Sequence, residues 1–369
     1  MSHNPPFRAD IVGSFLRTDA IHEAREQHAA GAISDSELRG IEDREIEELL
    51  GKEREAGLRV ATDGEFRREW WHYDFFDGLE NVAVVGSDHS FPFQGATPKP
   101  VALSVTDRIG WNARHPFLEH ARYVVEHAGD AVAKFTIPAP TVLYFRLEPG
   151  FSKTPLYASH EDVLDDVVAT YQAAIQAFYD LGVRYLQLDD TAWAYLCSDL
   201  ELERARERGL DTDGIADRFA EVLNRVLASK PADLTITTHV CRGNFRSTWI
   251  ASGGYEPVAK QLLADTAYDG YFLEYDTDRA GGFEPLRFLP QGDKTVVLGL
   301  VTSKSGDLEA VEDIKARIQE AARHAPLEQL ALSPQCGFAS TEEGNVLTEA
   351  QQWAKIREIV AIAEEVWGD

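Results

Sequence analysis

Short apolar runs alternate with longer segments of helical periodicity along most of the 369-residue chain. Eight of these runs have the length and composition of strands: 8–12, 58–62, 132–137, 184–189, 234–240, 271–275, 295–300 and 329–333. Strands that alternate with helices are typical of βα units, which build a parallel sheet. The pattern therefore predicts an α/β protein.

The segments between the apolar runs carry helix signals. Residues 159–181 repeat apolar side chains at spacings of three and four, and Ser159 with Asp162 has the spacing of a capping box. Residues 307–324 and 349–366 show the same periodicity. We therefore expect amphipathic helices that cover the predicted strands.

Eight strands with intervening helices predict a single (β/α)₈ barrel of the TIM type over residues 1–369. Residues 77–114 depart from the alternation because they are rich in Gly, Pro and Ser and contain two short alternating runs. We expect a hairpin inserted there, after the second strand. An open doubly wound sheet is the alternative, but the chain has no glycine-rich phosphate loop between a strand and a helix.

The charge and the cysteines narrow the class of protein. The chain has 62 acidic and 36 basic residues, a net charge of −26, which disfavours binding to nucleic acid or anionic lipid. No apolar run approaches the ~18 residues of a membrane span, and the N-terminus lacks the layout of a signal peptide. The three cysteines are too few and too far apart for a disulfide framework. We expect a cytoplasmic protein with reduced cysteines.

Metal-competent residues stand where the predicted strands end, which is where a TIM barrel places its chemistry. His239 and Cys241 lie two apart on one strand end, so their side chains point to the same side. Imidazole and thiolate are preferred zinc ligands. Glu274 ends the next strand, and Cys336 follows the eighth. These four residues predict a zinc site at the mouth of the barrel.

Other interpretations of these residues remain open at this point. A buried cysteine is often a small packing residue, which is the alternative for Cys336 taken alone and the interpretation that we adopt for Cys197. A lone histidine in a strand, such as His239, is more often a satisfied core residue than a ligand. A structural zinc site usually draws its ligands from close pairs in the sequence, whereas these ligands are spread from His239 to Cys336. The spread over successive strand ends favours a catalytic metal.

Six motifs in fixed order resemble the C-terminal catalytic domain of cobalamin-independent methionine synthase. They are VGSF at 12–15, DGE at 63–65, LQLDD at 186–190, THVC at 238–241, LEYD at 273–276 and SPQCGF at 333–338. The resemblance extends from about residue 8 to residue 366 and is greatest to the short, single-barrel members. It implies Zn²⁺ held by His239, Cys241, Glu274 and Cys336. It also implies methyl transfer to homocysteine, giving methionine, as in 5-methyltetrahydropteroyltriglutamate–homocysteine S-methyltransferase.

The resemblance also implies a pocket for the amino-acid part of the thiol substrate. The backbone of Val12, Gly13 and Ser14 would meet its carboxylate, and Glu65 and Asp189 would hold its ammonium group, with Asp189 counted among the catalytic residues. Two converging carboxylates are a reasonable cation clamp, although helix capping or strand-end hydrogen bonding is the alternative for each. Coordination to zinc would deprotonate the substrate thiol, whose free pKa is about 8.5.

Three positions depart from the family pattern. Lys304 replaces the proton-donating histidine, Phe145 replaces the tryptophan that covers the folate ring, and Tyr195 replaces the glutamate that reads the pterin. The family's basic N-terminal barrel is also absent, and a charge of −26 disfavours a polyanionic donor. The thiol side therefore looks preserved and the donor side rebuilt. Candidate donors are a simpler methyl carrier, a methylated corrinoid or an epoxide.

The aromatic run at 69–76 (EWWHYDFF) follows Glu65 and is open to two interpretations: a lid over the donor, with Trp70, Trp71 and Tyr73 facing the mouth, or a core helix. The leading functional hypothesis is a zinc-dependent S-methyltransferase. The alternatives are a zinc-dependent alkyl- or epoxide-to-thiol transferase, a zinc-binding barrel without turnover, and a metal-free lyase related to uroporphyrinogen decarboxylase.

Overall fold

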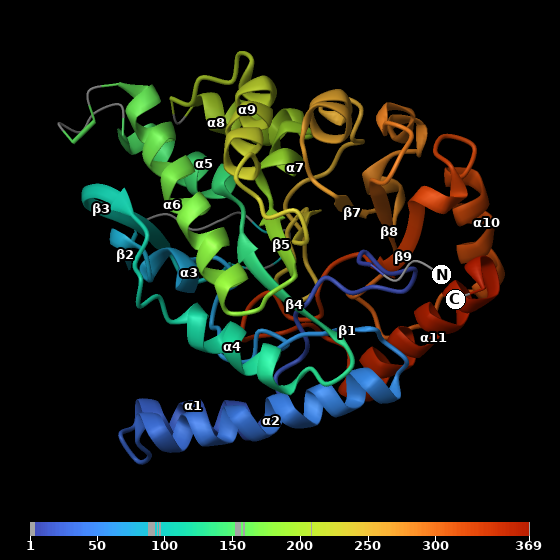
Figure 1. Cartoon of the computed structure of the whole chain (residues 1–369), viewed down its shortest axis with the longest axis horizontal. Coiled ribbons are helices and arrows are strands. Elements are labelled where there is room, and N and C mark those ends of the chain that lie inside the picture. The colour runs from blue at the N-terminus through green and yellow to red at the C-terminus, as the bar shows by residue number, and fades with distance from the viewer. Residues whose placement is uncertain are drawn as a thin grey trace.

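Seven parallel strands form one curled sheet in the computed structural model, which describes residues 4–87, 93, 95, 97–151, 156–157, 159–207 and 209–368 (Figure 1). In spatial order they are β1 (Val60–Ala61), β4 (Val132–Pro138), β5 (Tyr185–Asp190), β6 (Thr235–Val240), β7 (Gly270–Glu274), β8 (Thr295–Val301) and β9 (Leu330–Pro334). Each overlaps a predicted strand, and neighbours pair in parallel. The predicted α/β barrel of the TIM type is confirmed.

The predicted strand at 8–12 is wrong, because this segment makes only one parallel bridge, between Ala9 and Leu332. The Asp10 carboxylate accepts a hydrogen bond from the backbone N–H of Ile11, at 2.8 Å. A side chain thus binds a backbone group that a regular ladder would use. Apolar composition alone could not reveal this competition.

The same irregular segment nevertheless closes the barrel between β9 and β1. On one side the N–H of Leu332 donates to the carbonyl of Arg8, at 2.8 Å. On the other side the N–H of Phe15 donates to the carbonyl of Gly64, at 3.0 Å. The chain before the first helix therefore occupies the place of an eighth strand.

A buried ion pair lies inside the barrel beside this segment. Lys134 Nζ is 3.3 Å from Asp10 Oδ1, and both side chains are fully buried. The hydroxyl of Tyr185 donates to Asp10 Oδ2 at 3.0 Å, and Lys134 also donates to the carbonyl of Ile11. We call Asp10, Lys134 and Tyr185 the closure network, since they tie the irregular segment to β4 and β5.

Helices cover the outside of the sheet, with α1 and α2 along one edge of the molecule in Figure 1. The α-helices are α1 (Asp19–Ala29), α2 (Asp35–Glu55), α3 (Tyr73–Asp77), α4 (Phe117–His127), α5 (Pro140–Phe151), α6 (His160–Asp180), α7 (Ala192–Leu196), α8 (Asp199–Glu207), α9 (Ile215–Leu227), α10 (Val311–Ala321) and α11 (Glu349–Trp367). A π-helix, η1 (Lys260–Asp265), and the 3₁₀ turns η2 (Asp278–Ala280), η3 (Glu284–Phe288) and η4 (Leu327–Gln329) complete the connections.

The sequence signals for three of these helices agree with the structure. The predicted segments 159–181 and 307–324 contain α6 and α10, the segment 349–366 covers all of α11 except its last residue, and the capping box that begins at Ser159 is present. None of the helices within the described ranges has the length and apolarity that crossing a bilayer requires.

The hairpin predicted after the second strand is formed by β2 (Glu80–Gly86) and β3 (Val101–Gly110), which pair antiparallel. It packs beside α3 and α6 (Figure 1). Within the predicted insertion 77–114, residues 88–92, 94 and 96 lie outside the described residues.

Candidate metal centre and substrate cavity

The four predicted metal ligands lie together at the carboxyl ends of β6, β7 and β9. One ligand atom from each of His239, Cys241, Glu274 and Cys336 lies within 4.8 Å of the others, and all four residues are buried. The sulfur atoms of the two cysteines are 3.6 Å apart, and both cysteines are free. The barrel thus brings residues from three strand ends to one point.

The donor set at this point fits a zinc ion. Both ring nitrogens of His239 and Oε2 of Glu274 are buried without a hydrogen-bond partner. Leaving such atoms unpaired costs about 1–3 kcal/mol each, a cost that a bound cation would remove. Two sulfurs, an imidazole and a carboxylate are the ligand types that zinc prefers. The residues present therefore suit this metal.

Contact between the two thiols shifts their pKa values in opposite directions. Contact with the sulfur of Cys241 lowers the pKa of Cys336 well below its ordinary value, although burial opposes the shift. The contact with Cys336, together with burial, raises the pKa of Cys241. Ionisation of Cys336 is therefore favoured over ionisation of Cys241, and a thiolate there would attract a cation.

Lys304 lies on the metal side of the site. Its Nζ is buried without a hydrogen-bond partner. Burial raises the pKa of Glu274, and the charge of Lys304 opposes this shift. Lys304 is not among the residues that line the cavity described next. The structure brings it to the metal ligands, and its function as a proton donor stays a prediction.

A cavity opens over the metal ligands at the carboxyl ends of the strands. His239, Cys241 and Cys336 line it together with Glu65 and Asp189. The ligands and the predicted ammonium clamp, which are far apart in the sequence, thus face the same space. This is the arrangement that a substrate with both a thiol and an amino group requires.

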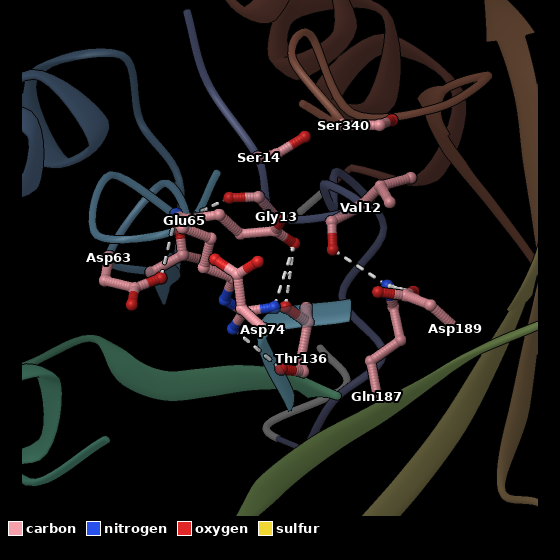
Figure 2. Close-up of polar contacts among 12 residues, drawn as sticks. Val12, Gly13, Ser14, Asp63, Glu65, Asp74, Thr136, Gln187, Asp189 and Ser340 are labelled. Carbon is pink, nitrogen blue, oxygen red and sulfur yellow. Dashed lines mark hydrogen bonds and ion pairs between the residues drawn. The ribbon is translucent and has the colours of Figure 1, made fainter. Parts of the chain in front are cut away.

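Glu65 enters the cavity from the turn after β1, where its φ of 59° lies in the left-handed region. The Thr136 hydroxyl donates to Glu65 Oε1 at 2.9 Å (Figure 2). An Arg68 nitrogen lies 3.5 Å from the same atom. Glu65 Oε2 is buried without a partner. Burial raises the pKa of Glu65, while the charges of Arg68 and Arg17 lower it. One carboxylate oxygen therefore remains free to bind a ligand.

Asp189 enters the cavity from β5 and is held by its neighbour on the same side of the strand. The Gln187 amide donates to Asp189 Oδ1 at 2.6 Å and to the carbonyl of Val12 at 2.8 Å (Figure 2). Burial raises the pKa of Asp189 to about 7, the charge of His239 lowers it, and the charge of Glu65 raises it. The two carboxylates thus repel each other, and a cation between them would relieve this repulsion.

The predicted carboxylate-binding segment packs tightly around Gly13. Its φ is 142°, and a Cβ at this position would lie 2.8 Å from Cγ2 of Thr136. The neighbouring residues Val12 and Ser14 both line the cavity. Only a residue without a side chain allows this segment to approach β4 so closely.

The predicted donor-side residues are only partly at the cavity. Tyr195 lines it, whereas Phe145 packs behind with its ring centroid 5.3 Å from that of Tyr195. In the aromatic run, Trp70 and Trp71 line the cavity, but Tyr73 lies along an outer groove. The first part of the run is therefore a cavity wall, as the lid interpretation expects, and the rest packs as a core helix.

Several residues at the site were missed from the sequence. Arg68, Thr136 and Gln187 support the two carboxylates, while His72 and Asn244 line the cavity itself. Gln187 carried a usable signal, because it lies two residues before Asp189 in an otherwise apolar strand. The others lie in segments whose direction depends on the tertiary fold.

Comparison with known proteins agrees with this geometry. Residues 146–365 match a family model described as the catalytic domain of cobalamin-independent synthase. The uncharacterized protein YxjH of Bacillus subtilis (strain 168) is 50% identical over 364 residues, 98% of this chain and 95% of that protein.

Solved structures show the same fold. A Listeria monocytogenes protein with the provisional name vitamin-B12 independent methionine synthase has a TM-score of 0.78 and 41% identity, covering 99% of both chains. The B12-independent methionine synthase from Shewanella sp. W3-18-1, solved in complex with selenomethionine, has a TM-score of 0.70 and 16% identity, covering 97% of both chains.

Proposed function

Because this chain belongs to the cobalamin-independent methionine synthase family, we propose that it is a zinc-dependent thiol methyltransferase. Its acceptor would be homocysteine or a similar amino-acid thiol, and its product methionine or an analogous thioether. The observation that carries the proposal is the shared cavity, in which His239, Cys241 and Cys336 face the same space as Glu65 and Asp189.

His239, Cys241, Glu274 and Cys336 would hold the zinc ion. Bound zinc lowers the pKa of a coordinating thiol enough to deprotonate it near neutral pH, and the thiolate is the nucleophile that alkyl transfer requires. Lys304, which does not line the cavity, would offset part of the negative charge of the four ligands. Its action as a proton donor is part of the proposal and is tested by Lys304→Met.

Glu65 and Asp189 would orient the acceptor through its ammonium group. Burial raises the pKa of both carboxyl groups, so an ammonium ion between them would favour the ionised form of each. The backbone at Val12 to Ser14 would meet the acceptor's carboxylate. Fixing both ends of the amino acid leaves its thiol side chain to reach the metal ligands.

The family match constrains the alkyl donor less than any other part of the proposal. Phe145 and Tyr195 stand where the family has its folate contacts, and they form a tilted aromatic pair. A folate carrier, a methylated corrinoid and an epoxide are therefore tested side by side. An epoxide that reacts while the methyl donors do not would replace methyl transfer by the alternative alkyl transfer.

The test begins with zinc analysis of the purified chain, for which we expect one ion per chain. The zinc-loaded enzyme is then incubated with homocysteine and each donor, and the thioether product is measured by mass spectrometry. A chain that is metal-free and fully active would contradict the proposal. A chain that binds zinc but forms no thioether with any donor would instead be a binding protein.

A further inference from the structure

His72 is a buried histidine in the wall of the cavity, and the proposed function gives it no part. Its exposed fraction is 2%, and neither ring nitrogen has a hydrogen-bond partner in the structure as described. Its ring packs against those of Trp71 and Tyr73, with centroids 4.4 and 4.1 Å away. Unpaired buried polar atoms cost free energy, so a substrate that supplies a partner would be favoured here.

A second buried histidine nearby shows what a packing residue looks like in the same region. His115 has an exposed fraction of 1%, and its Nε2 lies 2.8 Å from the carbonyl of Phe75. Its Nδ1 accepts a hydrogen bond from the N–H of Phe117 at 3.1 Å. His115 does not line the cavity. Backbone groups therefore pair both ring nitrogens of His115, whereas both ring nitrogens of His72 are left without a hydrogen-bond partner.

Few buried groups of the cavity lining lack a hydrogen-bond partner. Apart from the metal ligands and the Glu65–Asp189 clamp, unpartnered buried atoms of the described lining belong to His72, Asn244 and Thr341. The free atom of Asn244 is Oδ1, an acceptor, because its amide nitrogen already donates to the carbonyl of Gly337. Among these three residues, only His72 and Thr341 can therefore donate a hydrogen bond to a second substrate.

The surroundings of His72 favour it over Thr341 as the hydrogen-bond donor. Burial and the charge of Arg146 lower its pKa well below the ordinary value, so the ring is neutral at neutral pH and carries one N–H. A hydrogen bond in this water-poor setting, between aromatic rings, is stronger than one in water. The aromatic wall of Trp70 and Trp71 also provides apolar surface for an alkyl group.

We propose that His72 donates a hydrogen bond to the leaving atom of the alkyl donor, an inference that rests on the proposed function. In the transfer, the methyl carbon bonds to the thiolate sulfur as its bond to the leaving atom breaks. The electron pair stays on the leaving atom, to which the N–H of His72 would donate. A leaving nitrogen finally takes up, through solvent, the proton that the acceptor thiol released. The hydrogen bond thus strengthens as the reaction proceeds, which is what lowers a barrier.

The test compares donors that differ in their need for this hydrogen bond. Zinc-loaded wild-type, His72→Phe and His72→Gln enzymes react with homocysteine and 5-methyltetrahydrofolate, whose leaving nitrogen gains negative charge during the transfer. Methyl iodide and S-methylmethionine serve as reference donors, because iodide and a neutral thioether both leave without a hydrogen bond. We expect His72→Phe to lower kcat about 100-fold with the nitrogen donor, and less than about 2-fold with the reference donors. His72→Gln, which keeps an N–H, should recover part of the loss.

Three controls separate this function from a structural one. His115→Phe should lower thermal stability without a donor-specific effect, Thr341→Val should leave the ratio between donors unchanged, and zinc content should stay at the wild-type value in His72→Phe.

Equal losses with all donors, or no loss, would overturn the inference, as would a Thr341→Val effect that matches that of His72→Phe. A wild type that reacts with methyl iodide or methylcobalamin alone would overturn it too. No turnover with any donor would overturn the proposed function itself.

Discussion

Two buried polar clusters inside this barrel differ in how their atoms are paired. In the closure network, Asp10 accepts from Lys134 and Tyr185, and no atom of the three side chains lacks a partner in the part of the chain described. In the metal cluster, both nitrogens of His239 and Oε2 of Glu274 have no hydrogen-bond partner, although an Arg279 nitrogen lies 3.7 Å from Oε2. A protein that only needed to fold would gain by pairing or removing the second set. In this pair of clusters, the fully paired one supports the fold and the incompletely paired one offers atoms to a ligand.

The largest effect should come from the metal cluster. Cys336→Ser should reduce zinc affinity by more than about 1,000-fold and abolish thioether formation, because each ligand contributes several kcal/mol to zinc binding. The free energy of unfolding of the metal-free chain should change by less than about 1 kcal/mol. Zinc analysis, turnover and urea unfolding measure the three quantities. Cys197→Ser is the matched control, since Cys197 is buried outside the cluster and should keep zinc and turnover.

The closure network should respond in the opposite way. Lys134→Met leaves the Asp10 carboxylate buried without its cation and should lower the free energy of unfolding by about 3–5 kcal/mol. Zinc bound per folded chain should stay unchanged. Lys260→Met, which removes an exposed ion pair with Asp265, should cost less than about 1 kcal/mol in the same urea titration. Equal effects of the two substitutions would contradict a supporting function for the closure network.

Glu65→Gln tests whether the cavity carboxylates bind the acceptor. Loss of one charged contact to the ammonium group should cost about 2–3 kcal/mol, which raises the KM for homocysteine roughly 30- to 150-fold. Zinc content should not change. Glu53→Gln, at a buried carboxyl group that does not line the cavity, should leave this KM at the wild-type value. A Glu65→Gln enzyme with unchanged KM would remove Glu65 from the clamp.

Glu53 also gives a prediction on the pH dependence of stability. Burial raises its pKa to about 8, although hydrogen bonds from Thr62 oppose the shift. Between the ordinary carboxyl pKa and about 8, the folded chain holds a proton that the unfolded chain has released, so this group costs stability as pH rises. Glu53→Gln should therefore match the wild type near pH 4 and become more stable as pH rises, by up to about 5 kcal/mol above pH 8. Urea unfolding across this range checks the sign, and a difference that does not vary with pH would contradict it.

The sequence predicted that the four proposed metal ligands lie together, because a regular rule relates their positions to the fold. Residues at the carboxyl ends of parallel strands meet at one end of a barrel, so the sequence alone could predict that Cys241, Glu274 and Cys336 lie close together. The same rule placed Asp189, and the alternation along β5 placed Gln187 beside it. The predicted strands that form the sheet were right because their apolar runs have the length and composition of strands.

Features that depend on competition between local and distant contacts could not be predicted. The segment at 8–12 has the composition of a strand, but Asp10 binds its neighbour's backbone and the distant Lys134 at once. The orientation of Lys304, behind the metal ligands and outside the cavity lining, depends on the turn after β8. The unpaired ring nitrogens of His72 could not be predicted either, because only the structure shows that they lack hydrogen-bond partners.

The 3.6 Å separation of the Cys241 and Cys336 sulfur atoms also has a consequence for handling the protein. Two thiols this close can be joined by an oxidant, and a disulfide would need the two atoms to approach to about 2 Å. Oxidation of a metal-free chain would thus convert two of the proposed zinc ligands into a bond that cannot bind zinc. Bound metal would keep these sulfur atoms reduced, so metal loss and oxidative inactivation are expected to be linked, and a reductant would restore both zinc binding and turnover.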